Sequence, residues 1–203
     1  MLDFIHYTAP ARRPGLPTLL LLHGTGGDER SLLPLAANVL PDAAILSPRG
    51  KVLEHGMPRF FRRLAEGVFD LPDLHARTDE LAAFIEAATA HYNLAGERLI
   101  AMGYSNGANM AGSLLLQYPT LLAGAVLLRP MVPFEPDQPP DLHGRRVLIV
   151  AGQFDSMVPA AQSQRLADLL MACGAEVNHH ILPADHGLTN ADLTFTREWL
   201  AGA

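Results

Sequence analysis

Short apolar runs recur along this chain, and longer stretches with helical spacing separate them. Thr18–Leu22 is the clearest run, because it is continuous and ends at a glycine-rich turn. That pattern is typical of a strand buried on both faces of a parallel sheet. Four more runs follow it, at Ala43–Leu46, Leu99–Met102, Ala125–Leu128 and Val147–Val150. Val177–Leu182 is a weaker sixth strand, because His179 and His180 interrupt it.

The stretches between these runs predict helices, which several proline and glycine residues help to end. The predicted helices are Ser31–Leu40, with Ser31 as a candidate N-cap, Leu74–His91, Asn106–Tyr118, Ala160–Ala172 and Leu193–Ala203. Alternating strands and helices predict an α/β fold with a mostly parallel central sheet and helices on both faces. With 203 residues, the chain is expected to form one domain, spanning residues 1–203, since cores divide only beyond about 250–300 residues.

Two of the predicted connections are long. Arg129–Arg145 is rich in proline, so we expect no helical cap to form there. Pro48–Leu71 carries several large apolar residues, including Phe60 and Phe69, and is too apolar to remain in water. Long loops in compact domains are usually functional or disordered. We therefore expect Pro48–Leu71 to fold over the site, with Phe60 and Phe69 walling a shallow substrate pocket.

Composition and charge exclude several classes of function. The net charge of −6 leaves no basic footprint, which argues against nucleic acid and anionic membrane surfaces as partners. No apolar run approaches the roughly 20 residues that span a bilayer, so no membrane insertion is expected. The N-terminal residues resemble no signal peptide, and the single cysteine, Cys173, precludes an intramolecular disulfide. The expected location is the cytoplasm.

The pentapeptide Gly103-Tyr104-Ser105-Asn106-Gly107 lies between a predicted strand and a predicted helix. A nucleophile elbow, the G-x-S-x-G turn of α/β hydrolases, requires this context. The turn brings the residues two before and two after the serine so close that side chains there would clash. Glycine at both positions therefore predicts the α/β-hydrolase fold, with Ser105 as nucleophile.

A second glycine-rich turn, His23-Gly24-Thr25-Gly26-Gly27, follows the first strong strand. Acyl transfer needs two backbone N–H groups directed at the developing oxyanion. We expect one from Asn106, at the positive end of its helix, and the other from Thr25.

A serine nucleophile needs a base, and the base needs an orienting carboxylate. In α/β hydrolases the chain order is serine, acid, histidine. Asp155 follows the strand Val147–Val150, at the sheet edge where parallel sheets place their active sites. His186 lies in the turn after the last strand, whereas the other histidines lie within strands or too early in the chain. The alternatives are a helix N-cap for Asp155 and a solvated loop residue for His186.

Arg129 is unusual, because a charged residue there interrupts an apolar environment at a strand end. It either pairs with an acid or lines the substrate pocket. Arg59, Arg62 and Arg63 are expected to form internal ion pairs, with substrate binding as the alternative. No metal-binding motif is present, so neither a metal nor a cofactor is expected.

At these residues the chain resembles the carboxylesterase/phospholipase branch of the α/β hydrolases, the acyl-protein-thioesterase-like group. The resemblance covers nearly the whole chain and rests on His23-Gly24, the elbow, Asp155 with Val158-Pro159, and His186-Gly187. Leu128-Arg129-Pro130-Met131 and Gly67-Val68-Phe69-Asp70 are more similar to a bacterial subgroup that includes hydroquinone-induced hydrolases.

The resemblance implies a cytoplasmic, cofactor-free and often dimeric carboxylic-ester hydrolase with Ser105, Asp155 and His186 as its triad. Asn106 replaces the glutamine common in thioesterases, and phenylalanines replace their tryptophan-bearing pocket segment, which argues against lipid–protein substrates. The leading hypothesis is hydrolysis of small carboxylic esters. The alternatives are a thioesterase or lysophospholipase with the same triad, and a ligand-binding pseudo-hydrolase.

Overall fold

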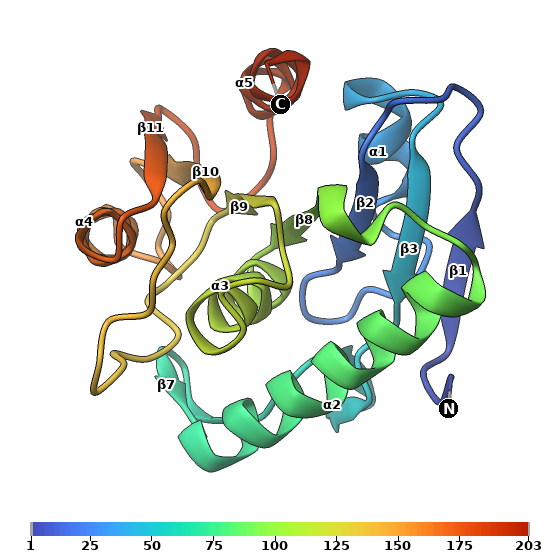
Figure 1. Ribbon diagram of the computed structural model, residues 1–203. Coiled ribbons are helices and arrows are strands. Elements are labelled where there is room, and N and C mark those ends of the chain that lie inside the picture. Colours follow the sequence, from blue (N-terminus) through green and yellow to red (C-terminus); the bar gives the residue numbers. More distant parts are fainter. Residues whose placement is uncertain (1, 203) are drawn as a thin grey trace.

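In the computed structural model, which describes residues 2–202, a seven-stranded sheet runs through the molecule (Figure 1). Its strands are β1 (His6–Ala9), β2 (Thr18–Leu22), β3 (Ala44–Pro48), β8 (Leu99–Tyr104), β9 (Gly124–Leu128), β10 (Arg146–Gly152) and β11 (Glu176–Leu182). Their order across the sheet is β1-β3-β2-β8-β9-β10-β11. Only β1 runs antiparallel to its neighbour; all other pairs are parallel.

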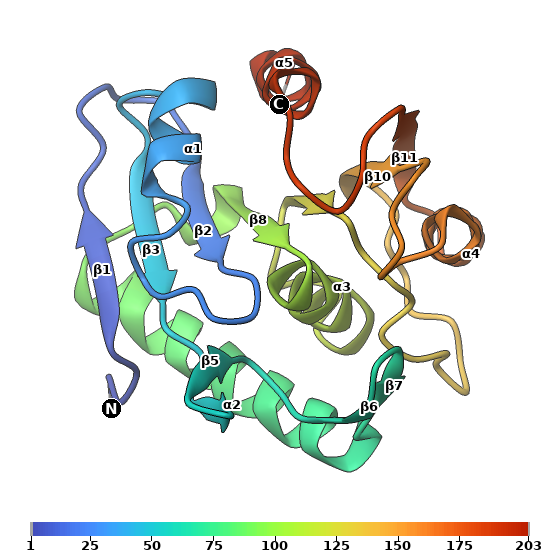
Figure 2. The same cartoon turned by 180° about the vertical axis from the view of Figure 1, so that it is seen from behind.

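Helices cover both faces of this sheet (Figures 1 and 2). They are α1 (Leu33–Val39), α2 (Leu71–His91), α3 (Asn106–Gln117), α4 (Ala160–Ala172) and α5 (Asn190–Ala201). Helices α1 and α5 share one face, and α2, α3 and α4 share the other. Side chains of β2 alternate between the two resulting cores: Leu20 and Leu22 face α3, whereas Leu19 and Leu21 face α1. Burial on both faces explains why β2 is apolar at every position.

The structure confirms the predicted α/β fold and all six predicted strands, with boundaries shifted by up to two residues. Strand β1, a short antiparallel edge strand of half-buried residues, was not predicted. Helix α5 starts three residues earlier than predicted, and Ala203 lies outside the described residues. The N-cap assignment of Ser31 is wrong. Leu32 occupies that position, and the Ser31 hydroxyl instead donates to Asp28.

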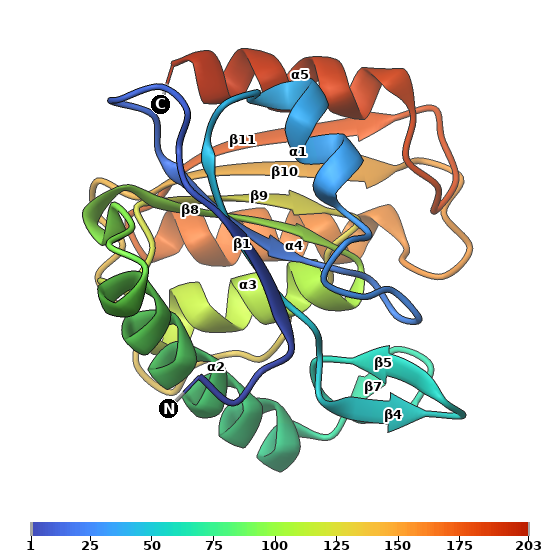
Figure 3. The ribbon, with the colours of Figure 1, turned by 90° about the vertical axis from the view of Figure 1, so that its right-hand side faces the viewer.

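The long connection after β3 folds into two small hairpins, which lie below the sheet and beside α2 in Figure 3. Strand β4 (Val52–Glu54) pairs with β5 (Met57–Arg59), and β6 (Arg63–Ala65) pairs with β7 (Val68–Phe69). These strands are only two or three residues long, too short to show a period in the sequence. Residues 129–145 contain neither helix nor strand, as expected for a fold without a helical cap. No helix within residues 2–202 is long and apolar enough to cross a membrane.

Candidate active site

Ser105 lies at the tip of the sharp turn between β8 and α3. Its backbone is strained, with φ of 52° and ψ of −114° in a residue other than glycine. The turn is too tight for neighbouring side chains. A β-carbon on Gly107 would lie 2.0 Å from the carbonyl oxygen of Leu22, and one on Gly103 would lie 2.5 Å from the carbonyl oxygen of Gly107. The two glycines therefore allow the strand and the helix to approach as a nucleophile elbow requires.

His186 and Asp155 meet Ser105 at the carboxyl edge of the sheet. Nε2 of His186 lies 3.0 Å from Oγ of Ser105, and its Nδ1 lies 2.7 Å from Oδ2 of Asp155. Because an ionised carboxylate only accepts hydrogen bonds, Nδ1 carries the imidazole proton in this arrangement. Nε2 then remains free to accept the proton of the serine hydroxyl.

The Asp155 side chain is almost fully buried and is held in place by its other oxygen. Oδ1 accepts hydrogen bonds of 2.9 Å from the backbone N–H groups of Met157 and Val158. Pro159, not Asp155, is the N-cap residue of α4, so the alternative role considered for Asp155 is not the one observed. Its carboxylate is instead oriented toward the imidazole.

The two residues expected to bind an oxyanion, Thr25 and Asn106, both line the cleft beside Ser105. Among the described residues, their backbone N–H groups donate to no other protein group. Asn106 begins α3, where unpaired N–H groups create a partial positive charge. The cleft is thus lined by two residues whose backbone N–H groups have no protein acceptor among residues 2–202.

The loop carrying His186 is held by Arg129, which does not line the pocket. Its guanidinium is fully buried and forms an ion pair with the equally buried Asp192, 2.6 Å between Nη1 and Oδ1. Nε donates to the carbonyl of Asp185 (3.0 Å), and Nη2 donates to that of Gly187 (2.7 Å). The placement of Arg129 in the substrate pocket is therefore corrected. It supports the backbone on both sides of His186.

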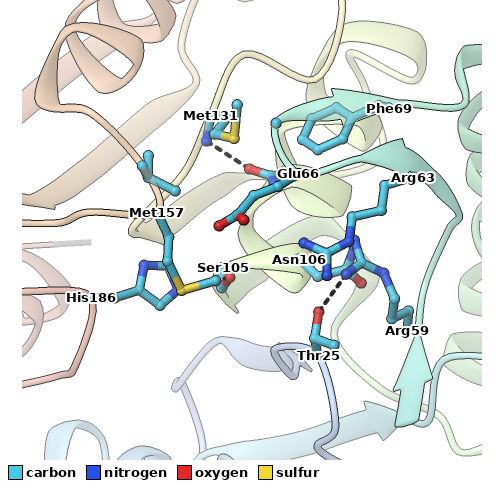
Figure 4. A pocket seen from close by; sticks show the side chains of 13 residues that line it. Thr25, Arg59, Arg63, Glu66, Phe69, Ser105, Asn106, Met131, Met157 and His186 are labelled. Carbon is cyan, nitrogen blue, oxygen red and sulfur yellow. Dashed lines mark hydrogen bonds between the residues drawn. The ribbon is translucent and has the colours of Figure 1, made fainter. Parts of the chain in front are cut away.

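The predicted pocket phenylalanines take different positions. Phe69 lines the cleft, as expected (Figure 4). Phe60 does not, because its ring is buried in the core and packs on His23, with 4.7 Å between ring centroids. Other lining residues were not predicted from the sequence, including Glu66, Asn109, Met131 and Met157. They lie in or beside segments that the family resemblance singles out, but only the folded chain shows that their side chains line one cleft.

The arginines of the long connection form ion pairs, as expected, and two of them share one acid, Glu54. Glu54 accepts from Arg59 (3.2 Å) and from Arg63 (2.9 Å). The hydrogen bond from Arg63, assisted by both positive charges, keeps the pKa of Glu54 below its usual value. Arg62 pairs with Asp70 and Asp73 outside the cleft. Arg59 and Arg63 nevertheless line the cleft, so pairing and exposure to a ligand are not exclusive.

His23, at the start of the Thr25 turn, is a neutral structural link. Its Nδ1–H donates to the carbonyl of Gly24 (2.7 Å), and its Nε2 accepts from the N–H of Gly50 (3.0 Å). Burial lowers the pKa of His23 below its usual 6.5. This histidine therefore joins two loops around the cleft and takes no place beside Ser105.

Comparison with known proteins places these residues in a wider context. A family model described as Phospholipase/Carboxylesterase matches residues 5–202. The hydrolase MhqD of Bacillus subtilis (strain 168) is 48% identical over 181 residues, which cover 89% of this chain and 90% of that protein. The structure of the Bacillus cereus carboxylesterase has a TM-score of 0.96 at 46% identity, covering 98% of this chain and 94% of that one. A carboxylesterase from Mesorhizobium loti has a TM-score of 0.88 at 37% identity, covering 92% and 89%.

Proposed function

The chain belongs to the Phospholipase/Carboxylesterase family and has the α/β-hydrolase fold, and we propose that it is a serine esterase of small carboxylic esters. The observation that carries the proposal is the line of hydrogen bonds from Asp155 through His186 to Ser105. This line ends beside two backbone N–H groups without a protein partner among residues 2–202. A nucleophile, its base, the orienting acid and oxyanion donors are the parts that acyl transfer requires.

In the proposed reaction, Oγ of Ser105 attacks the ester carbonyl carbon while Nε2 of His186 takes the hydroxyl proton. The carbonyl oxygen becomes an oxyanion and accepts hydrogen bonds from the N–H groups of Thr25 and Asn106. The alkoxide leaves and receives its proton from His186, which leaves an acyl group on Ser105. Water then attacks this acyl-enzyme, with His186 again as base, and the acid is released.

The cleft favours small substrates. Its innermost space, where solvent-sized groups fit, is only about 40 Å³, and the cleft opens to solvent around it. Phe69, Met131 and Met157 provide apolar walls near Ser105 (Figure 4), and residues 129–145 supply no helical cap. We therefore propose short acyl groups, about C2–C6. The proposal also includes a single domain that acts in the cytoplasm. The family resemblance implies a cofactor-free and often dimeric enzyme, so a homodimer is the assembly to test.

Pre-steady-state kinetics with p-nitrophenyl acetate test the mechanism. The wild-type chain should release a burst of p-nitrophenol equal to the enzyme concentration, and mass spectrometry after an acid quench should locate an acetyl group on Ser105. Ser105→Ala should remove the burst and lower turnover on the order of a millionfold. Ser156→Ala is the matched control, because this exposed serine lies outside the cleft.

Two results would reject parts of this proposal. A burst that survives in Ser105→Ala would move the nucleophile elsewhere. A wild-type chain that binds esters but forms no acyl-enzyme would favour the pseudo-hydrolase. A panel of oxygen esters and acyl-CoA thioesters of equal acyl length separates an esterase from a thioesterase, since only the leaving group differs.

A further inference from the structure

The first hairpin of the long connection contacts both residues proposed as oxyanion donors. The backbone N–H of Gly26 donates to the carbonyl of Pro58 (2.9 Å). Nη1 of Arg59 donates to Oγ1 of Thr25 (2.9 Å), the contact drawn in Figure 4. The backbone N–H of Phe60 donates to Oδ1 of Asn106 (2.8 Å). Three consecutive residues, 58–60, thus hold the two strand-to-helix turns that flank the cleft.

This segment is itself rigidly held. The Arg59 side chain is buried, and its Nε donates to the carbonyl of Phe61 (3.2 Å). The same guanidinium pairs with Glu54, across the β4–β5 hairpin. A β-carbon on Gly50 would lie 2.2 Å from the carbonyl oxygen of Arg59, so the two backbones are in close contact. A continuous set of contacts therefore runs from Glu54 through Arg59 to Thr25.

An oxyanion hole works only if its donors are already in position when charge develops. The hydroxyl of Thr25 has Arg59 as its one hydrogen-bond partner among residues 2–202. The Asn106 side-chain oxygen likewise depends on the backbone of Phe60. Without these contacts, only two flexible, glycine-containing turns would hold the donor N–H groups in position. A misplacement of about 1 Å can cost about a hundredfold in rate.

We propose that Arg59 is a positioning residue of the oxyanion hole, acting through the Thr25 hydroxyl while its neighbour Phe60 acts through Asn106. This inference rests on the proposed esterase function and deepens it. Arg59 touches the donor residue, and its effect reaches the reacting oxygen through that residue. It differs from a role in binding a substrate anion, which would require no contact with Thr25.

Two substitutions test the link from its opposite ends. Thr25→Val keeps the backbone N–H and the shape of the side chain but removes the hydroxyl, and Arg59→Met removes the guanidinium. Each should lower kcat for p-nitrophenyl acetate by about tenfold to a hundredfold, with little change in KM, since only transition-state binding is lost. The double variant should lose no more than Arg59→Met alone, because both changes remove one shared interaction.

Inhibitor binding gives a readout that a purely structural role would not affect. A trifluoromethyl ketone forms an oxyanion on the enzyme and should bind each variant more weakly by the same factor as kcat falls. The corresponding methyl ketone, which stays neutral, should bind all variants alike. Arg62→Met is the matched control, because Arg62 is exposed, lies outside the cleft and pairs with Asp70 and Asp73 at the start of α2. Thermal unfolding of every variant shows which ones remain folded.

The outcomes separate this inference from the proposed function. If wild type shows no acyl-enzyme, the esterase proposal fails. If wild type is active but Thr25→Val keeps its kcat and its affinity for the trifluoromethyl ketone, the positioning role of Arg59 is wrong. Additive losses in the double variant, or a rise in KM confined to anionic esters in Arg59→Met, would assign Arg59 to substrate binding instead. Should Arg59→Met fail to fold, Thr25→Val alone decides between these results.

Discussion

Arg129 and Asp192 form an ion pair with both side chains fully buried, 2.6 Å between Nη1 and Oδ1. Asp192 also closes the capping box of α5 with Thr189. Through its other N–H groups, Arg129 holds the carbonyls of Asp185 and Gly187, on either side of His186. The pair therefore connects the last helix to the loop that carries the proposed catalytic base.

Removing one partner of this pair should affect both stability and catalysis. Arg129→Met should lower the free energy of unfolding by about 3–5 kcal/mol, because Asp192 is left as an unpaired buried charge. The double variant Arg129→Met with Asp192→Leu should recover part of that loss. Urea denaturation measures both values, and kcat should fall in Arg129→Met as the His186 loop loses its support.

Arg165→Met, which breaks an exposed pair with Glu135, should change stability by less than about 1 kcal/mol. A native-like Arg129→Met would contradict this account.

The orienting acid can be identified by comparing two neighbouring carboxylates. Asp155→Asn should reduce kcat about ten-thousandfold, since an amide at this position favours the wrong imidazole tautomer. Asp185→Asn provides the matched comparison, because Asp185 is adjacent to His186 but accepts from Gly187 instead. Its loss should stay below about tenfold. Equal losses in the two variants would show that Asp155 has no special role.

Acyl-chain selectivity should follow the size of the cleft. The kcat/KM of p-nitrophenyl esters should peak at about C2–C6 acyl chains. Each methylene that fits the cleft should stabilise the transition state by up to about 0.8 kcal/mol. Phe69→Ala should move the peak to longer chains, whereas Phe195→Ala, on α5 and away from the cleft, should leave it in place. Efficiency that keeps rising to palmitoyl esters would refute the small pocket and favour the thioesterase or lysophospholipase.

The buried neutral His23 should make stability depend on pH. Its pKa is lowered in the folded chain, so below about pH 6.5 the unfolded chain binds more protons than the folded one. The free energy of unfolding should therefore fall as the pH drops below about 6.5. His179, whose pKa burial also lowers, contributes with the same sign.

In His23→Gln the pH dependence of the urea midpoint between about pH 5 and 6.5 should become shallower. His91→Gln, at an exposed position, should keep the wild-type slope, and an unchanged slope in His23→Gln would contradict the prediction.

Local patterns in the sequence were sufficient to predict the main architecture. The apolar runs identified the central strands because parallel strands buried on both faces are apolar at every position. Gly103 and Gly107 marked the elbow because the turn leaves no space for a β-carbon. Asp155 and His186 could be chosen from chain order and strand ends, since the carboxyl ends of parallel strands converge at one edge. Edge strand β1 and the short hairpins escaped prediction, because two to four half-exposed residues carry too little periodic signal.

What the sequence alone determined, then, was the α/β architecture, the strained serine turn and the chain order of the candidate triad. Only the tertiary structure decided which side chains meet. Arg129 pairs with Asp192, which is 63 residues away in the sequence, and Arg59 contacts Thr25, which is 34 residues away. It also separated Phe69, in the cleft, from Phe60, in the core. The physical reason is that secondary structure and tight turns follow from neighbouring residues, whereas the partner of a buried charge depends on strand order, register and the path of the hairpins.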